Sequence, residues 1–277
     1  MIELVTAIIF ELIRSEPPEM VHPTVWFGKI IKVLDRFMPG TVVFGVIPPL
    51  ATTIFAFILA EIPSMIPKPL SYILAGYLLY TSISIRSMLE HAERCVEGGR
   101  INLMEVKKIV SRDLNDAEEW MMNSAVIESM AENFIDGVLA PLLYYSVFGI
   151  HGALIYRAIN TCDAMLGYRK GRYERFGKIS ARLDDLANLI PSRVSLILYL
   201  ILSKRAFFCG MRKNPKFNGH SVSAMAGLLG VRLEKTGYYT IDCGKDPETG
   251  DVKKAMKSFT ALSGMAVLSA LLLRLLV

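Results

Sequence analysis

The central stretch of the chain, residues 125–160, reads AVIESMAENFIDGVLAPLLYYSVFGIHGALIYRAIN. It places Glu128, Glu132 and Asp136 at intervals of four residues. On one α-helix these carboxylates would fall within an arc of about 80°, where like charges repel. The repulsion is stronger beside an apolar segment, because the charges are less well screened there. We therefore expect a positive partner against this face, and we predict Mg²⁺ with a phosphate group.

An apolar segment follows the acidic stretch. Residues 137–156 carry no charged side chain and one histidine, His151. Pro141 and the turn-like sequence Gly149–Gly152 interrupt the segment. At 1.5 Å per residue, each half is too short to cross a bilayer core of about 30 Å. This pattern predicts a re-entrant helical hairpin, with one kinked span as the alternative, and either arrangement could bring its two polar ends together.

The composition favours a membrane enzyme with substantial polar loops. Of 277 residues, 52% are hydrophobic and 21% are charged, and the mean hydropathy is +0.39. This balance is too apolar for an ordinary soluble domain. The net charge of +5 is spread along the loops without a long Lys/Arg block, so we expect no nucleic acid partner and favour anionic lipid or phosphorylated substrates.

The uncharged runs predict an all-α, polytopic membrane protein, with one integral-membrane domain over residues 1–277 because no linker divides it. The expected spans lie near residues 41–61, 69–85, 137–156 (hairpin or span), 194–209 and 258–275. Residues 102–116 are expected to form an amphipathic surface helix. Basic loops flank the first two spans, so the positive-inside rule predicts the cytoplasmic membrane with cytoplasmic active loops.

The four cysteines predict neither a disulfide framework nor a zinc site. They are Cys95, Cys162, Cys209 and Cys243, which are scattered and form no Cys-x-x-Cys pair. Reduced thiols are the simpler expectation.

A second polar region follows the apolar segment. Asp184 and Asn188 lie four residues apart on an expected helix, with Asp185 beside them. Such oxygen ligands suit Mg²⁺, so these three residues are the candidate metal ligands. Arginine is the preferred fork for phosphate. The candidate substrate- and phosphate-binding residues are Asn160, Asp163, Tyr168, Arg169, Arg172, Arg182 and Arg193.

Two considerations bear on that region. Its charges could simply pair with each other in a solvated loop, but several acidic and amide clusters between residues 128 and 188 favour a site. The chain has no GxxxxGK[ST] or GxGxxG motif, so a nucleotide would have to be held in another way.

These motifs resemble the cobalamin-biosynthesis CobD/CbiB family of adenosylcobinamide-phosphate synthases. The resemblance covers nearly the whole chain. It includes residues 125–133 with Asp136–Gly137 and Ala140–Pro141, residues 158–161 with Asp163, Gly167–Arg169, residues 181–185 with Asn188, His22–Pro23 with Gly28, and residues 224–231.

The resemblance implies a C–N ligase of cobalamin biosynthesis. Such an enzyme joins the free propionate carboxylate of adenosylcobyric acid to aminopropanol or aminopropanol phosphate, with ATP and Mg²⁺. The implied partners are the corrinoid and amine substrates, membrane lipid and other cobalamin-biosynthesis enzymes. The implied catalytic residues are Glu128, Glu132, Asn133, Asp136 and His22, with Glu132 and His22 as the candidate general bases.

Two other functions stay open from the residues alone. Paired acidic motifs near membrane helices also serve Mg²⁺-dependent prenyl- or phospho-alcohol transferases. A non-catalytic membrane subunit that docks corrinoid enzymes is the second alternative.

Overall fold

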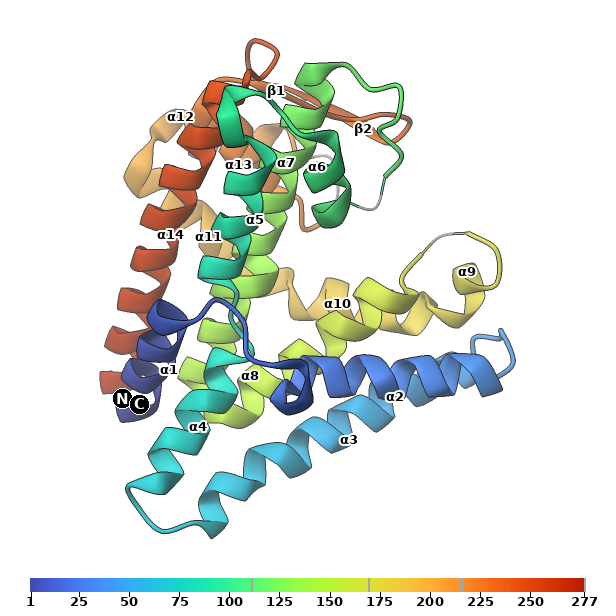
Figure 1. Cartoon of the computed structure of the whole chain (residues 1–277), viewed down its shortest axis with the longest axis vertical. Helices are drawn as coiled ribbons and strands as arrows, with labels where there is room; N and C mark the ends of the chain where they lie inside the picture. The colour runs from blue at the N-terminus through green and yellow to red at the C-terminus, as the bar shows by residue number, and fades with distance from the viewer. Residues whose placement is uncertain (111, 169, 215–216, 277) are drawn as a thin grey trace. The chain divides into compact units, whose positions relative to one another are not determined.

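The computed structural model describes residues 1–110, 112–168, 170–214 and 217–276 (Figure 1). Helices dominate this part of the chain, which confirms the all-α prediction. The α-helices are α1 (Ile2–Ile13), α2 (Pro23–Phe37), α3 (Ile47–Glu61), α4 (Leu70–Tyr80), α5 (Ile85–Cys95), α6 (Leu103–Ile109), α7 (Glu119–Phe134), α8 (Ala140–Leu166), α9 (Tyr173–Phe176), α10 (Lys178–Ala187), α11 (Leu189–Leu202), α12 (Lys204–Arg212), α13 (His220–Leu229) and α14 (Thr249–Leu276). A π-helical turn, η5 (Ile135–Leu139), joins α7 to α8, and strands β1 (Arg232–Lys235) and β2 (Tyr239–Asp242) form an antiparallel hairpin.

The chain divides into two compact units, each described here by itself. Unit 1 comprises Met1–Ser84, Ala140–Asn188 and Leu268–Val277, and unit 2 comprises Ile85–Leu139 and Leu189–Val267. The chain passes from one unit to the other four times: between α4 and α5, between η5 and α8, between α10 and α11, and within α14. The single domain expected from the sequence stays a prediction.

In unit 1, α8 packs against α2, α3, α4 and α10. Its core includes Phe27 of α2, Leu59 of α3 and Leu154 of α8, all buried. Helices α1 and α4 also pack closely, because α4 carries Gly76 at their contact. A Cβ on Gly76 would lie 2.6 Å from the Cβ of Thr6, so a larger residue would push the helices apart.

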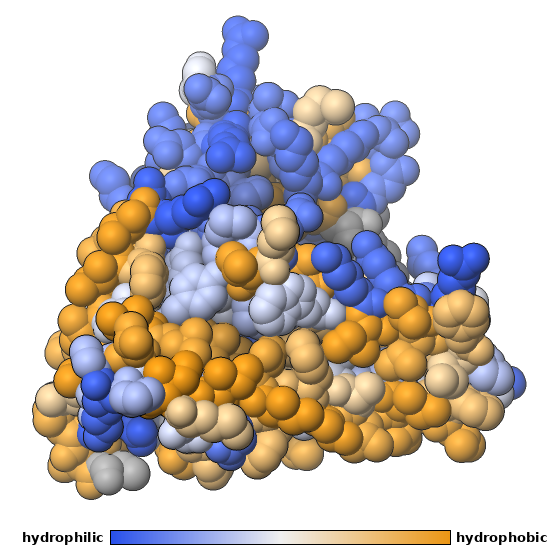
Figure 2. Space-filling model, turned by 60° about the horizontal axis from the view of Figure 1, so that its bottom comes forward, coloured by the Kyte–Doolittle hydropathy of each residue, from blue (hydrophilic) through white to orange (hydrophobic). Residues whose placement is uncertain are grey.

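The structure confirms a polytopic membrane protein. In the described residues, three helical stretches are long and apolar enough to cross a membrane: Phe44–Met65, Glu119–Leu166 and Thr249–Leu276. They overlap the expected spans near 41–61, 137–156 and 258–275. Much of the surface seen in Figure 2 is apolar. Exposed large side chains on α3 and α14 include Phe57, Ile58, Leu272 and Leu275, as expected for contact with lipid.

The remaining expected spans contain shorter helices. Residues 69–85 hold α4, which has 11 residues. Residues 194–209 hold most of α11 and α12, and α10 with α11 makes a fourth candidate span only as a pair bent by 41°. Inside α8, Gly149 has φ 65° and ψ −154°, which breaks the helix at the turn anticipated from Gly149–Gly152.

Unit 2 is built around α7, which contacts α5, α6, α13 and β1. The β1–β2 hairpin was not anticipated. Its register pairs Lys235 with Tyr239, and Gly237 in the connecting turn has φ +77°, a conformation that favours glycine. The expected surface helix is also shorter than predicted, because α6 ends at Ile109 and Val110 is extended.

The cysteine prediction is wrong for one pair. Cys209 of α12 and Cys243, just after β2, form a disulfide with their Cα atoms 6.8 Å apart. Cys95 and Cys162 are free and buried, as expected. The pair is 34 residues apart in sequence, and spacing alone does not reveal that the end of the hairpin returns to α12.

Candidate functional site

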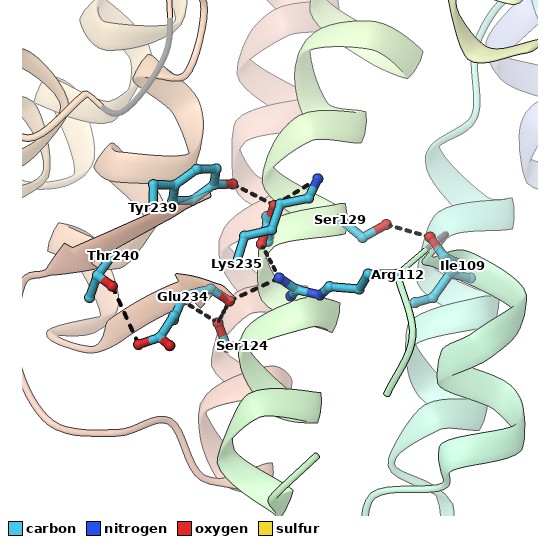
Figure 3. Close-up of polar contacts among 9 residues, drawn as sticks. Ile109, Arg112, Ser124, Ser129, Glu234, Lys235, Tyr239 and Thr240 are labelled. Carbon is cyan, nitrogen blue, oxygen red and sulfur yellow. Dashed lines mark hydrogen bonds and ion pairs between the residues drawn. The ribbon is translucent and has the colours of Figure 1, made fainter. Parts of the chain in front are cut away.

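A buried carboxylate on α7 organises the first candidate site, in unit 2. Glu128 is only 3% exposed. The Tyr239 hydroxyl donates to its Oε1 atom, Arg112 Nη1 lies 3.1 Å from its Oε2 atom, and Lys235 Nζ lies 3.8 Å from Oε1. Figure 3 shows Arg112, Lys235 and Tyr239 converging here. The predicted positive partner of the acidic face is therefore supplied, at Glu128, by the protein itself.

The β1–β2 hairpin and the segment after α6 supply those partners. Lys235 and Tyr239 face each other across the hairpin register. Arg112 Nη1 also donates to the Glu234 backbone oxygen at 2.9 Å. The Ser124 hydroxyl accepts from the Glu234 backbone nitrogen at 2.9 Å, which fastens β1 to α7. The hairpin is thus held in the position that brings its side chains to Glu128.

A small cavity of about 90 Å³ opens beside these groups. We call it the glutamate pocket; it is lined by Ile109, Val110, Arg112, Ala125, Glu128, Ser129, Glu132 and Lys235. Two carboxylates and two cations therefore face one small space. In the described residues, Arg112 Nη2 is buried without a hydrogen-bond partner, so this guanidinium retains a donor for a ligand.

Tyr239 acts as a hydrogen-bond donor in this pocket. Burial and the neighbouring Glu128 carboxylate raise the pKa of Tyr239 well above its ordinary value. The hydroxyl therefore keeps its proton and donates a hydrogen bond to Glu128 rather than becoming a phenolate.

The other predicted catalytic residues of this stretch follow in the chain. Glu132 lines the glutamate pocket, and Asn133 lies at the end of α7, half-buried. The prediction of one continuous α-helical acidic stripe is wrong at Asp136, because Asp136 lies in the π-helical turn η5. In a π-turn each backbone hydrogen bond spans five residues instead of four, so the side chains that follow point in a different direction than in a continuous α-helix.

A second polar cluster lies in unit 1; we call it the amide network. Asn160 Nδ2 donates to Asp184 Oδ1 at 3.1 Å, and Asn188 Nδ2 donates to Asp184 Oδ2 at 3.0 Å. The Tyr156 hydroxyl donates to Asn188 Oδ1 at 2.9 Å. Asp184 and Asn188 lie on one helical face, as the spacing predicted. Asp185 is the next residue of α10, about 100° around it.

His22 lies near this network in unit 1. Burial and, next in size, the nearby Arg157 guanidinium lower the pKa of His22 to about 4. Its imidazole is therefore neutral at physiological pH, and its Nδ1 atom is buried without a hydrogen-bond partner in the described chain. Arg157 Nη1 in turn lies 3.4 Å from Asn160 Oδ1. The structure thus links the electrostatic surroundings of His22 to the amide network.

A mostly apolar cavity of about 390 Å³ shares Tyr156 with the amide network. It is lined by Tyr144, Phe148, His151, Gly152, Ile155, Tyr156, Ile159 and Ala187. The Tyr144 hydroxyl donates to the Ala187 backbone oxygen at 2.8 Å, which ties α8 to the end of α10.

The predicted phosphate-binding arginines lie in different surroundings. Arg172 Nη2 lies 3.1 Å from Asp35 Oδ1 and donates to the Asp35 and Met38 backbone oxygens, so it fastens its loop to α2. Arg182 is exposed on α10. Arg193, in unit 2, donates to the Leu189 backbone oxygen at 2.8 Å. Their binding roles stay predictions.

The last three predicted substrate-binding residues belong to the end of α8 and the segment after it. The Asp163 carboxylate lies against the backbone of Gly167, where a Cβ would come within 2.0 Å of Oδ1. Tyr168 is half exposed, and Arg169 lies outside the described residues.

Asp184 is the one carboxylate of the amide network, and Mg²⁺ was the ion predicted for this region. Among the described residues, no group of three His, Cys, Asp or Glu side chains could hold a metal ion. Mg²⁺, however, commonly binds through one or two carboxylates and keeps several waters. The Asp184 carboxylate alone fits that mode of binding, because the two amides present Nδ2 donors rather than oxygens to it.

Several residues of these clusters were not predicted from the sequence. They are Arg112, Lys235 and Tyr239 around Glu128, and Tyr156 and Arg157 around Asn160. The Thr236–Gly237 turn between two polar segments was the available signal for the hairpin. Arg112 was expected to lie on a surface helix, and that expectation gave no indication of its ion pair with Glu128.

Comparison with known proteins places the chain in a family. The model of the CobD/Cbib protein family matches residues 4–267. A relative from Archaeoglobus fulgidus, named as a probable cobalamin biosynthesis protein CobD, is 47% identical over 96% of this chain and 91% of its own length. Similarly named relatives from Thermococcus kodakarensis and Methanocaldococcus jannaschii are 41% and 36% identical over 99% and 94% of this chain, and 96% and 92% of their own lengths. No solved structure matches the chain. The chain belongs to the CobD/CbiB family.

Proposed function

We propose that this protein is an amide-forming ligase of cobalamin biosynthesis. It joins the propionate carboxylate of adenosylcobyric acid to aminopropanol or aminopropanol phosphate at the cytoplasmic membrane, with its polar loops in the cytoplasm. The names of the curated relatives support the pathway. The main support for an amide-forming reaction is the glutamate pocket, because carboxylates and cations line one small space there.

The pocket suits the amine substrate in both size and charge. At about 90 Å³ it admits a small molecule and excludes a corrinoid ring. Arg112 and Lys235 are suited to a phosphate group, and Glu132 is suited to the ammonium group. Glu128 holds Arg112 and Lys235 toward the pocket through their ion pairs.

The amine must lose a proton before its nitrogen can attack the carboxyl carbon. Glu132 lines the pocket, and its carboxylate would accept that proton. Tyr239, whose proton stays on the hydroxyl, would keep Glu128 fixed while the charge on the amine changes.

The carboxyl carbon also needs a leaving group, and Mg²⁺ with ATP would supply a phosphoryl group for its oxygen. The Asp184 carboxylate would hold the ion, with water completing its coordination, and Asp185 extends this acidic segment. The amine nitrogen would then form the C–N bond, and the carbonyl C–O bond would break with inorganic phosphate as the leaving group.

The test uses the full chain in nanodiscs with adenosylcobyric acid, ATP, Mg²⁺ and either amine, and detects the amide by mass spectrometry. In Lys235→Gln we expect kcat/KM for aminopropanol phosphate to fall about tenfold, the loss typical of one charge-assisted hydrogen bond. The value for aminopropanol should change less than about twofold. Arg232→Gln, on the same strand but outside the pocket lining, is the matched control. Absence of amide product with both amines would refute the function.

A second function is favoured by the apolar cavity beside the amide network. A Mg²⁺-dependent prenyl- or phospho-alcohol transferase needs an apolar groove next to oxygen ligands, and unit 1 contains both. Turnover of a polyprenyl phosphate without any corrinoid would favour it. A non-catalytic docking subunit would instead support corrinoid-dependent growth unchanged after Glu132→Gln or Asp184→Asn.

A further inference from the structure

A third cavity, of about 490 Å³, lies in unit 2 and shares no lining residue with the glutamate pocket. We call it the basic pocket; it is lined by Arg205, Phe208, Cys209, Arg212, Lys213, Asp242 and Cys243. Three cations and one carboxylate therefore face it. The excess of two positive charges means that an anion is attracted to this space.

The three cations of the basic pocket are held by backbone oxygens and a ring rather than by carboxylates. Arg205 donates to the Cys243 backbone oxygen, and Lys213 donates to the Asp242 backbone oxygen. The Arg212 guanidinium lies 5.5 Å from the centre of the Phe208 ring. Within the described chain none of the three forms an ion pair with a carboxylate.

Seven other cations of unit 2 do lie against a carboxylate. Arg86, Lys108, Arg112, Arg232, Lys235, Lys245 and Lys254 each lie within ion-pair distance of a carboxylate. The positive charge around the basic pocket is thus locally uncompensated. A carbonyl contact fixes a guanidinium without neutralising it, and it leaves further N–H donors for a ligand.

The small-residue helix α13 explains how these side chains are positioned. A Cβ on Gly227 would lie 2.5 Å from the Cys209 Cβ, so glycine lets α12 and α13 pack at backbone distance. Gly230 ends α13 with φ +69°, and a Cβ there would lie 3.3 Å from Arg205 Nη1. The glycines therefore leave room for the Arg205 guanidinium between the helix and the hairpin.

We propose that the basic pocket binds the phosphate group of an organic phosphate. Arginine forks recognise phosphate oxygens through paired N–H donors, and Lys213 adds a point charge. Phosphate can reach the pocket from two sources. α12 directly follows the apolar helix α11 and exposes Phe208 and Met211, which suits a phospholipid headgroup, whereas the open volume also suits a soluble phosphate ester. This inference does not depend on the proposed ligase reaction.

The experiment measures phosphate binding by the full chain in two arms. In the first, the protein in maltoside detergent, which carries no phosphate group, is titrated with inorganic phosphate by calorimetry. In the second, protein extracted from nanodiscs of phosphatidylcholine and phosphatidylglycerol is analysed by native mass spectrometry for retained lipid. We expect Arg212→Gln to weaken binding about tenfold in the arm that shows it, and Arg205→Gln/Arg212→Gln to abolish it. Lys204→Gln, an exposed cation of the same helix outside the pocket, is the matched control.

A variant that is expected to bind phosphate more tightly separates a loss of ligand binding from structural damage. Asp242→Asn removes the one carboxylate of the pocket and should tighten binding about two- to fivefold. Binding only in the first arm would identify a soluble phosphate, and retained lipid only in the second would identify a headgroup. The proposal is overturned if wild type binds in neither arm, if Lys204→Gln weakens binding as much as Arg212→Gln, or if Asp242→Asn weakens it.

Discussion

The buried ion pair between Arg112 and Glu128 should couple much more strongly than an exposed pair in the same unit. The two side chains are 16% and 5% exposed, and Nη1 lies 3.1 Å from Oε2. Breaking a buried pair by removing one partner costs about 3–5 kcal/mol. Tyr239 and Lys235 still face Glu128 after the change Arg112→Gln, so we expect a loss of about 2–3 kcal/mol in the free energy of unfolding.

A double-mutant cycle isolates the pair itself. We expect Arg112→Gln and Glu128→Gln to show a coupling energy of about 2 kcal/mol. The control cycle uses Arg86 and Glu90 of α5, which are 2.8 Å apart but 44% and 32% exposed. Exposed helical pairs of this kind couple by about 0.3–0.5 kcal/mol.

Unfolding in mixed micelles can be followed through the fluorescence of Trp120 on α7, in a Trp26→Phe background that removes the second tryptophan. Burial, rather than distance, is the reason for the expected difference, because the control pair is the shorter of the two. Equal coupling in the two cycles would refute this reasoning.

Three further predictions concern unit 1 and α14. The pKa of His22 is lowered to about 4 in the folded chain, against an ordinary 6.5, so the unfolded chain binds more protons between these two values. The contribution of His22 to the free energy of unfolding should be complete above pH 6.5 and should be lost as the pH drops toward 4. His22→Asn should flatten that part of the curve of stability against pH. Asn188→Leu should lower the unfolding free energy by about 2–3 kcal/mol in denaturant titration, because it removes an acceptor of the Tyr156 hydroxyl and one of the two amide donors to Asp184. Gly177→Ala should destabilise the fold by at least about 1–3 kcal/mol, since its Cβ would lie 1.7 Å from a backbone oxygen. The control Gly264→Ala, with open space around it in α14, should stabilise the fold by about 0.5–1 kcal/mol. A shift of the thermal unfolding midpoint in the same direction for both variants would contradict this reasoning.

Much of the fold followed from local composition. A run of uncharged residues long enough to cross a bilayer must be helical, because its backbone groups have no other partners in lipid. Residues 41–61 and 258–275 could be assigned on that basis. The break at Gly149 and the shared face of Asp184 and Asn188 also followed from the sequence, because both depend on neighbours within a few residues of the same helix.

The partners of Glu128 could not be obtained in this way. Periodicity shows which face of a helix is covered, but not which element covers it. Tyr239 lies 111 residues from Glu128 in sequence, and Arg112 lay in a segment whose own pattern indicated an ordinary surface helix. Only the folded hairpin brings Lys235 and Tyr239 to α7.

The sequence by itself therefore determined a helical membrane protein with an acidic stretch in need of positive charge. The tertiary structure decided that Arg112 and Lys235 supply this charge at Glu128, and that η5 takes Asp136 out of the α-helical spacing. It also decided that α12 and the end of the hairpin line a basic pocket. The physical reason is the same in each case: these contacts join segments far apart in the chain, and their geometry depends on how whole elements pack rather than on the order of neighbouring residues.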